Sequence, residues 1–251
     1  MVLLLDIGNT FLKWVCREGD SRSCEGELLH AGEELADVFS EAWDELAPPT
    51  AVHVANVAGV ELAESLDSWL QDNWNVSAHY AETQEQAFGV QNAYQVPGQL
   101  GVDRWLAMLA AWNQYHSAVC VIDCGTALTV DAIDANGQHL GGLITPGLGM
   151  MRDSLLVGAD GIELEAESAL ESADSLLAHN TQGGVEVGSL YAVLAFIDRI
   201  QGDLQRELGD EMRCILTGGD APDIAPLLAQ EVSLQPQLVL DGLALGVSAP
   251  V

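Results

Sequence analysis

The sequence Leu3-Leu4-Leu5-Asp6-Ile7-Gly8-Asn9-Thr10 opens the chain, and a variant of it, Val121-Ile122-Asp123-Cys124-Gly125-Thr126-Ala127, recurs near the middle. Each stretch is an apolar run that ends in an aspartate, followed by one residue, a glycine and a hydroxyl or amide side chain. An apolar run bounded by a glycine turn indicates a buried strand. The aspartate then projects from the strand end, and the glycine lets backbone N–H groups approach an anion. Two copies indicate a duplicated fold that holds a phosphate between its halves.

A third glycine turn, Leu216-Thr217-Gly218-Gly219-Asp220-Ala221, follows another apolar run, so three loops are available for a nucleotide. The pattern around these turns predicts the same succession of strands and helices twice. Such a duplicated α/β architecture is typical of the actin-like or sugar-kinase-like (ribonuclease H-like) fold, with two lobes and a nucleotide cleft between them. No low-complexity linker divides the chain, so we expect an N-terminal lobe over 1–116 and a C-terminal lobe over 117–251.

The expected elements follow from apolar periodicity and from the positions of Gly and Pro. Strands are expected at 2–6, 11–17, 23–30, 51–56, 76–80, 119–123, 128–133, 139–144 and 213–217. Helices are expected at 33–46, 60–73, 102–114, 150–157, 168–178, 184–208 and around 240–247. Residues 81–100 have little periodicity and are expected to form a loop over the site.

The charge of the chain is strongly negative. The 251 residues carry 38 acidic and eight basic side chains, for a net charge of −30. Such a surface repels nucleic acid and anionic membranes, so neither is expected as a partner. The acidic residues alternate with apolar ones at helical spacing, as in Glu33-Glu34-Leu35-Ala36-Asp37-Val38-Phe39, which indicates a folded protein with a solvated acidic coat. We interpret this coat as an adaptation to high salt.

The cysteines and the apolar segments bear on the compartment. The five cysteines, at 16, 24, 120, 124 and 214, are odd in number and form no CxxC pair, so neither a disulfide framework nor a zinc site is expected. No apolar run reaches the roughly 18 residues that would span a membrane, and the N-terminus is not typical of a signal peptide. A cytoplasmic, reducing location is therefore predicted.

Three of the eight cationic side chains lie beside glycine-rich turns, where an anionic ligand would need them: Lys13, Arg104 and Arg152. The alternative is ion pairing with the abundant carboxylates. Asp103 could be a base that accepts a proton from a hydroxyl nucleophile, or it could cap the helix that begins nearby. Residue chemistry alone leaves both alternatives open.

Other polar residues of the turns could bind a nucleotide and its cations. Asp6 and Asp123 could each hold Mg²⁺ or a monovalent cation, or could cap their own turns. Asp131 could be a further cation contact or a strand-end acid. Side chains that could donate to phosphate oxygens are Asn9, Thr10 and Thr126. The histidines at 53, 79 and 116 have no partner spacing and are expected to be structural.

Six motifs, taken in order, resemble the type III pantothenate kinase family. They are Asp6-x-Gly8-Asn9-Thr10-x-x-Lys13-Trp14, Leu100-Gly101-Val102-Asp103-Arg104-Trp105, Asp123-x-Gly125-Thr126-Ala127-x-Thr129-x-Asp131, Gly141-Gly142-Leu143-Ile144-x-Pro146-Gly147, Asn180-Thr181-x-Gly183-Gly184 and Leu216-Thr217-Gly218-Gly219. The resemblance implies ATP-dependent phosphorylation of pantothenate to 4′-phosphopantothenate, the first step of coenzyme A biosynthesis. It further implies Mg²⁺ with ATP, a monovalent cation (K⁺ or NH₄⁺) and a homodimer.

The resemblance also assigns roles to individual residues. Asp103 matches the proton acceptor and Asp123 the monovalent-cation ligand. The nucleotide contacts that it implies are Asp6, Ile7, Gly8, Asn9, Thr10, Phe11, Leu12, Lys13 and Thr126. The pantothenate contacts that it implies are Tyr94, Gly101, Val102, Asp103, Arg104 and Thr181. The chain departs from the family pattern at 157–165, where a proline-containing stretch is expected.

Two other functions fit parts of the sequence. A sugar kinase would share the phosphate loops but would need a polar sugar site in place of Tyr94 and Arg104. A non-catalytic regulator could be built on the same fold, since relatives have been described as transcriptional accessory factors. The presence of Asp6, Asp103 and Asp123 argues against a regulator, and the net charge of −30 argues against direct contact with DNA.

Overall fold

The computed structural model describes residues 1–19, 21–158 and 177–248, which form two compact units. The first unit comprises residues 1–116, 137–139 and 237–251, and the second comprises 117–136 and 140–236. The first break between the two units lies between His116 and Ser117. The C-terminal segment, however, returns to the first unit, because its helix packs there. The helix expected over 168–178 lies almost entirely outside the described residues, as does most of the divergent stretch 157–165.

The first unit is built on a five-stranded mixed sheet. Its order is β3-β2-β1-β4-β5, with β2 antiparallel to both β1 and β3, whereas β4 is parallel to both β1 and β5. Residues of β1 alternate between the two faces of the sheet, since successive side chains of a strand point in opposite directions. The strands are β1 (Val2–Ile7), β2 (Phe11–Glu18), β3 (Ser21–Leu29), β4 (Ala51–Asn56) and β5 (Ala78–Tyr80).

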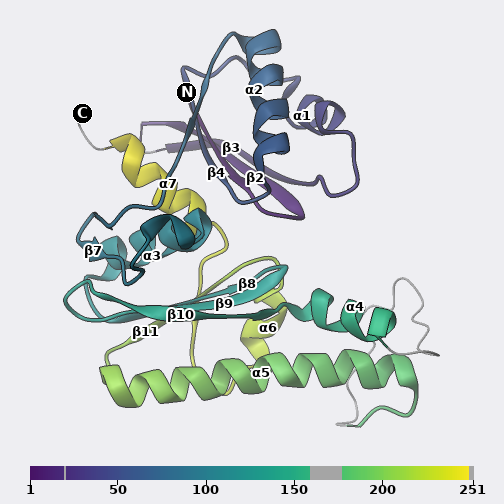
Figure 1. Cartoon of the computed structure of the whole chain (residues 1–251), viewed down its shortest axis with the longest axis vertical. Helices are drawn as coiled ribbons and strands as arrows, with labels where there is room; N and C mark the ends of the chain where they lie inside the picture. The colour runs from purple at the N-terminus through teal and green to yellow at the C-terminus, as the bar shows by residue number, and fades with distance from the viewer. Residues whose placement is uncertain (20, 159–176, 249–251) are drawn as a thin grey trace. The chain divides into compact units, whose positions relative to one another are not determined.

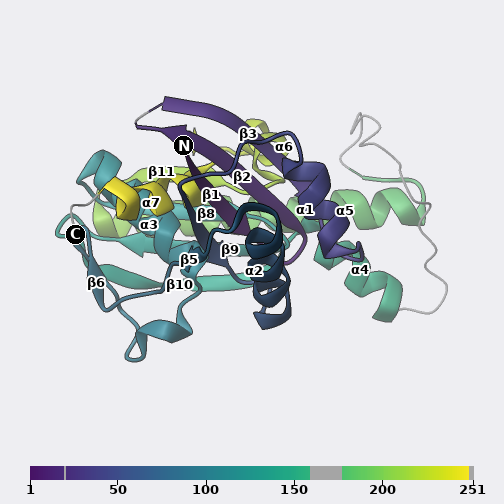
Figure 2. The same ribbon diagram turned by 90° about the horizontal axis from the view of Figure 1, so that it is seen from above.

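Helices α1 (Leu35–Trp43) and α2 (Val60–Trp74) lie side by side on one face of this sheet (Figure 2). Their apolar sides meet Leu3, Leu5 and Ile7 in one core that also holds stacked and edge-on aromatic rings. Helices α3 (Val102–Tyr115) and α7 (Leu238–Ser248) pack against each other and contact β1 and β4 (Figure 1). The expected strands and helices of this unit are confirmed, with ends shifted by a few residues.

The segment expected as a loop over 81–100 has some regular structure. It contains a short hairpin of β6 (Gln86–Ala87) and β7 (Val90–Gln91) and a 3₁₀ turn, η1 (Pro97–Gln99). The hairpin bridges to Gln138, which lies in the connection between β9 (Ala127–Ile133) and β10 (His139–Pro146). This contact explains why residues 137–139 are grouped with the first unit.

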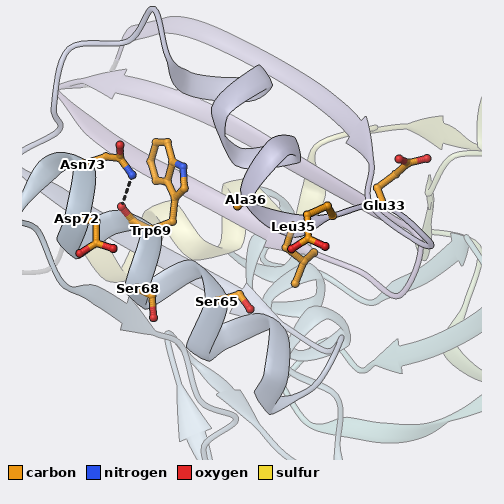
Figure 3. A pocket seen from close by; sticks show the side chains of 9 residues that line it. Glu33, Leu35, Ala36, Ser65, Ser68, Trp69, Asp72 and Asn73 are labelled. Carbon is orange, nitrogen blue, oxygen red and sulfur yellow. Dashed lines mark hydrogen bonds between the residues drawn. The ribbon is translucent and has the colours of Figure 1, made fainter.

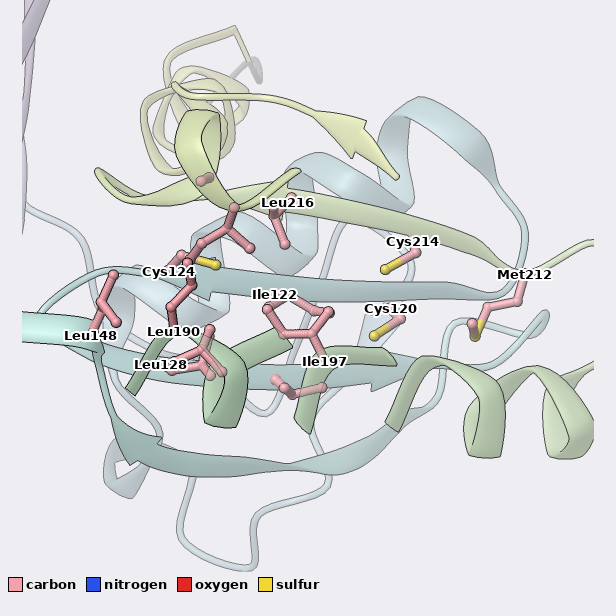
Figure 4. Close-up of a cluster of buried hydrophobic side chains, with 14 of the residues drawn as sticks. Cys120, Ile122, Cys124, Leu128, Leu148, Leu190, Ile197, Met212, Cys214 and Leu216 are labelled. Carbon is pink, nitrogen blue, oxygen red and sulfur yellow. The ribbon is translucent and has the colours of Figure 1, made fainter. Parts of the chain in front are cut away.

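The second unit repeats the sheet of the first. Its order is β10-β9-β8-β11-β12, with β8 antiparallel to β9 and parallel to β11. Helix α5 runs along one face of the sheet and buries Leu190, Val193 and Ile197 against it (Figures 1 and 4). The elements are β8 (Val119–Cys124), β9 (Ala127–Ile133), β10 (His139–Pro146), α4 (Leu148–Gly158), α5 (Thr181–Leu208), β11 (Arg213–Thr217), α6 (Ala221–Ile224), η2 (Ala225–Leu227) and β12 (Ser233–Leu234).

The cysteines differ from the expectation in one respect. Cys16 and Cys24 form a disulfide in the first unit, where the expectation was that no disulfide would form. The two residues are directly opposite each other in the antiparallel β2–β3 register, with Cα atoms 4.9 Å apart. The two cysteines are eight residues apart in the sequence and are brought together by strand pairing, which CxxC spacing does not reveal. The other three cysteines, Cys120, Cys124 and Cys214, are buried and free.

Over the part of the chain that the structure describes, no helix is both long enough and apolar enough to cross a membrane.

Candidate active site

The first glycine turn joins β1 to β2. Gly8 donates its N–H to the carbonyl of Phe11 (3.0 Å), which closes a tight turn over residues 8–11. Asp6 and Lys13 are directly opposite in the β1–β2 register, so their side chains project from the same face of the sheet. Lys13 Nζ also lies 3.7 Å from Glu27 on β3. The ion pair expected as an alternative for Lys13 therefore forms, and it holds the lysine beside Asp6.

The residue that follows β3 anchors this turn. His30 donates its backbone N–H to the carbonyl of Thr10 (3.0 Å), and its Nε2 lies 2.7 Å from the carbonyl oxygen of Gly8. The side chain is only 6% exposed. Sequence reasoning gave His30 no role, since a single histidine at a strand end carries no recognisable spacing.

The second group of predicted residues lies at the start of α3. Gly101, rather than Asp103, is the N-cap residue of this helix, and Asp103 lies in its first turn. Asp103 Oδ1 accepts a hydrogen bond from the N–H of Arg104 (2.7 Å), so the carboxylate does contribute to the helix start. A Cβ at Gly101 would lie 2.5 Å from the same oxygen, so a side chain there would displace the Asp103 carboxylate. Arg104 is buried, and its Nη1 donates a hydrogen bond to Tyr94 Oη (3.4 Å). The structure thus brings Tyr94, Asp103 and Arg104 together.

A buried polar network holds the segment that carries Tyr94. Asn92 Oδ1 accepts from the N–H of Tyr94 (2.9 Å), and the N–H of Ala93 donates to His139 Nδ1 (3.3 Å). The rings of Tyr94 and His139 are nearly parallel, at 8°, with centroids 6.1 Å apart. Asn92 and His139 are 6% and 1% exposed. Neither residue was expected to serve the site, because their roles depend on contacts between segments distant in the sequence.

Three glycine turns pack together in the second unit. Gly147 donates its N–H to the carbonyl of Thr126 (3.0 Å), and a Cβ at this position would overlap the backbone of Gly125 and Thr126. Gly218 has a φ of +95° and lies against Asp123 and the backbone of Cys124. Because no side chain intervenes, the Asp123 carboxylate and the backbone of all three turns are held in one small region.

Two charged residues flank these turns. Burial raises the pKa of the Asp220 carboxyl above its ordinary value, and the positive charge of nearby Arg152 offsets part of that rise. The Nε of Arg152 is buried without a hydrogen-bond partner. Asp131 is 2% exposed in the middle of β9, so it is a buried strand acid rather than one at a strand end. The pKa of the Cys120 thiol is raised, mainly by a hydrogen bond to Cys214 and then by burial. The negative charge of Asp131 adds to this rise.

The last predicted substrate residue, Thr181, begins helix α5. Asn180 caps this helix, since its Oδ1 accepts from the N–H of Gly183 (2.7 Å). Thr181 is exposed in the first turn, where backbone N–H groups have no intrahelical partner and attract anions.

A surface pocket of about 540 Å³ lies elsewhere, between α1 and α2 of the first unit (Figure 3). Its lining includes Leu35, Ser65 and Trp69 and contains none of the predicted site residues. The acidic residues Glu33, Glu34 and Asp72 also line it, so the pocket is unsuited to anionic substrates. Within the described residues, no cluster of three or more His, Cys, Asp or Glu side chains could hold a metal ion.

Comparison with known proteins agrees with these features. The family model for type III pantothenate kinase matches residues 2–202. A type III pantothenate kinase from Nitrosococcus oceani is 41% identical over 249 residues, covering 97% of this chain and 92% of the relative. Among solved structures, a Baf family protein from Campylobacter jejuni superimposes with a TM-score of 0.58 at 21% identity, covering 96% of this chain and 95% of that one. The ethanolamine utilization protein EutJ from Carboxydothermus hydrogenoformans gives 0.55 at 13%, covering 97% and 88%.

The duplicated sheets, with glycine turns at their strand ends, define the actin-like and sugar-kinase-like fold class. Within that class, the chain belongs to the type III pantothenate kinase family. Its reaction is the phosphorylation of pantothenate in coenzyme A biosynthesis, with ATP as the phosphoryl donor implied by the kinase family.

Proposed function

We propose that Asp103 is the base of this reaction and that Tyr94, Gly101, Val102, Arg104 and Thr181 bind pantothenate. The observation that carries the proposal is the contact of Arg104 with Tyr94 directly beside the Asp103 carboxylate. A guanidinium and a phenol hydroxyl can both donate to a carboxylate, and pantothenate carries one. The adjacent Asp103 carboxylate is then available to the substrate hydroxyl.

The nucleotide is assigned to the glycine turns. Residues 6–13 and Thr126 would contact the phosphates through backbone N–H groups, hydroxyls and the Lys13 ammonium. The transferred phosphoryl group carries its charge on oxygen atoms, so positioning and charge stabilisation account for most of the catalysis. During the transfer the pantothenate hydroxyl would attack the γ-phosphorus of ATP in line, the bond to the bridging oxygen would break to release ADP, and the hydroxyl proton would pass to the Asp103 carboxylate.

The donor atoms of the turns fit the two expected cations. Asp6 and Asp123 supply carboxylate oxygens, the ligands that Mg²⁺ and K⁺ prefer. A side chain at Gly218 would overlap both the Asp123 carboxylate and the Cys124 carbonyl, so the glycine leaves room for these two oxygens. Mg²⁺ is commonly held by one or two carboxylates together with substrate phosphates, so a larger acidic cluster is not required. We assign Mg²⁺ to the ATP phosphates, where it would neutralise negative charge, and K⁺ or NH₄⁺ to Asp123.

A homodimer is supported by the surface of α5. Between Thr181 and Ala195 the exposed side chains of this helix are uncharged, although the chain as a whole carries 38 acidic residues. They are mostly small, and Tyr191 is 49% exposed among them. Strand β10, at one end of the sheet, also exposes Leu140 and Ile144. Light scattering measures the dimer directly. We assign the enzyme to the cytoplasm because ATP is available there; the Cys16–Cys24 disulfide removes the argument from the cysteines for a reducing compartment.

The decisive experiment replaces Asp103 by asparagine. Removing the base should lower kcat by roughly 10²–10⁴-fold, because proton transfer contributes about that much to catalysis. Product formation is followed by mass spectrometry of 4′-phosphopantothenate. Asp37→Asn is the matched control, since Asp37 also lies in the first turn of a helix of the same unit. If both variants keep full turnover, Asp103 only supports the helix start and the proposed role is wrong.

A further inference from the structure

Two buried histidines contact the backbone of segments that carry substrate residues. His30 is 6% exposed and follows β3, whereas His139 is 1% exposed and begins β10. Both belong to the first unit. A buried polar side chain is costly to desolvate unless it forms hydrogen bonds, so these contacts fix the side chain and the segment together.

His30 acts on the turn that follows Asp6. Its Nε2 lies 2.7 Å from the Gly8 carbonyl oxygen, which can only accept, so Nε2 must donate. The backbone N–H of the same residue bonds to Thr10 at the other end of the turn. His30 therefore holds both ends of the turn, and the N–H groups of the turn keep a fixed direction.

His139 acts on the segment that carries Tyr94. The N–H of Ala93 donates to His139 Nδ1, so this nitrogen must keep its lone pair. The imidazole also lies parallel to the Tyr94 ring, at a centroid distance within the range of offset stacking. One side chain thus fixes the backbone before Tyr94 and the plane of its ring. The Tyr94 hydroxyl is in turn the partner of Arg104.

We propose that His30 and His139 are positioning residues, His30 for the ATP phosphate turn and His139 for the pantothenate contact Tyr94. Neither is assigned contact with a substrate, and each acts through one segment only. The inference rests on the proposed function, since it needs residues 6–13 to bind ATP and Tyr94 to bind pantothenate.

The experiment measures both Michaelis constants in His30→Gln and His139→Gln. We expect a rise of roughly tenfold in the KM for ATP with His30→Gln and in the KM for pantothenate with His139→Gln, because small misplacements of a binding group are costly. Each variant should leave the other constant within about twofold. Calorimetric titration of ATP without pantothenate gives the nucleotide affinity independently of turnover. His79→Gln is the neutral control, because His79 is exposed and contacts neither segment.

Two further variants separate positioning from general destabilisation. His139→Phe keeps a ring beside Tyr94 but removes the acceptor for Ala93, so its pantothenate KM should lie between those of the wild type and His139→Gln. It also replaces His139→Gln if that variant does not fold. If both histidine variants raise the two constants equally, or raise neither, the inference is wrong.

Tyr94→Ala shows whether a negative result contradicts the positioning role of His139 or the proposed pantothenate site itself. If Tyr94→Ala leaves the pantothenate KM unchanged, the proposed pantothenate site is wrong. If Tyr94→Ala raises it and His139→Gln does not, only the positioning role is wrong. In the double variant, His139→Gln should add little to Tyr94→Ala, because the histidine acts through the tyrosine.

Discussion

The turns after Asp6 and Asp123 occupy equivalent places in the two units but are held in different ways. In both, the residue after the third strand donates its N–H to the threonine of the turn at 3.0 Å: His30 to Thr10, and Gly147 to Thr126. In the first unit the carbonyl of Gly8 is reached by the imidazole of His30. In the second unit the equivalent carbonyl, that of Gly125, lies directly against the backbone of Gly147.

The difference shows how duplicated halves can diverge while keeping one backbone frame. In the first unit the His30 side chain reaches from the end of β3 to the carbonyl of Gly8. The turn there is therefore held by a side chain, which a substitution can change without moving the backbone. In the second unit the end of β10 lies so close to the turn after Asp123 that Gly147 has no room for a side chain. Helix α4 begins at the next residue. We therefore expect the second turn to be the less tolerant of substitution.

Gly147→Ala should produce the largest effect. The new Cβ would overlap the backbone of Gly125 and Thr126, so the turn must move. Overpacking of this kind costs roughly 1–3 kcal/mol of stability, and a displaced binding group costs about 100-fold in activity. Thermal melting and initial rates measure the two effects.

Gly149→Ala is the control for this substitution. Gly149 lies two residues further on, in α4, and a Cβ there meets nothing within 4 Å. Alanine favours a helix over glycine by about 0.5–1 kcal/mol, so this variant should be as stable as the wild type or more so. Equal activity of both alanine variants would mean that the close packing at Gly147 has no functional role.

The same comparison explains what the sequence could predict. The strands, their glycine turns and the duplication are visible because apolar runs and glycine carry local signals. The sheet orders β3-β2-β1-β4-β5 and β10-β9-β8-β11-β12 confirm the duplicated architecture. Short elements such as β12 and α6 were missed, since two to four residues give no periodicity.

The candidate site was predictable only where its residues lie in continuous motifs. Asp103 and Arg104 are neighbours in the sequence, whereas Tyr94 was expected at the site only from the resemblance to the family, and its contact with Arg104 was not predicted. His30 and His139 could not be found, because their partners are brought to them by strand pairing and by the bridge at Gln138. The Cys16–Cys24 disulfide was missed for the same reason.

Reduction of that disulfide should give the second-largest effect. The described cysteines of the second unit are thiols, so a reductant acts on the first unit only. A cross-link between residues eight apart stabilises by about 2–3 kcal/mol in the chain-entropy model. We expect a lower melting temperature in dithiothreitol for the wild type and no response for Cys24→Ser. A response of equal size in Cys24→Ser would place the effect at another cysteine.

Salt should act on both units alike. Each unit contains half of the 38 acidic and half of the eight basic residues, so the self-repulsion is evenly divided. The Debye length falls from about 10 Å at 0.1 M to about 3 Å at 1 M, which removes most repulsion between exposed carboxylates. We expect the melting temperature to rise on the order of 5 °C over this range. A flat or falling melting temperature, with KCl and NaCl measured separately, would show that the acidic coat is not a salt adaptation.

The smallest expected effect is on the pH dependence of stability, and it comes from a pair of histidines that is present in the first unit and has no counterpart in the second. His53 and His79 are paired on β4 and β5, with ring centroids 5.2 Å apart, whereas the equivalent pair on β11 and β12 is Ile215 and Ser233. Burial, and then the charge of His79, lower the pKa of His53 below its ordinary value of 6.5. The unfolded chain therefore binds more protons than the folded one as the pH falls below about 6.5.

The stabilisation that depends on neutral His53 is fully present above about pH 6.5 and is lost as the pH falls below it. Burial of His53 is only partial, so the change should be smaller than the effect of salt. His53→Ile, which copies the second unit, should flatten the dependence between about pH 5 and 7. Melting temperatures of both proteins across that range give the test. Because all groups outside the His53–His79 pair are the same in both proteins, the difference between the two curves isolates this pair. Parallel curves would mean that His53 has the same pKa folded and unfolded.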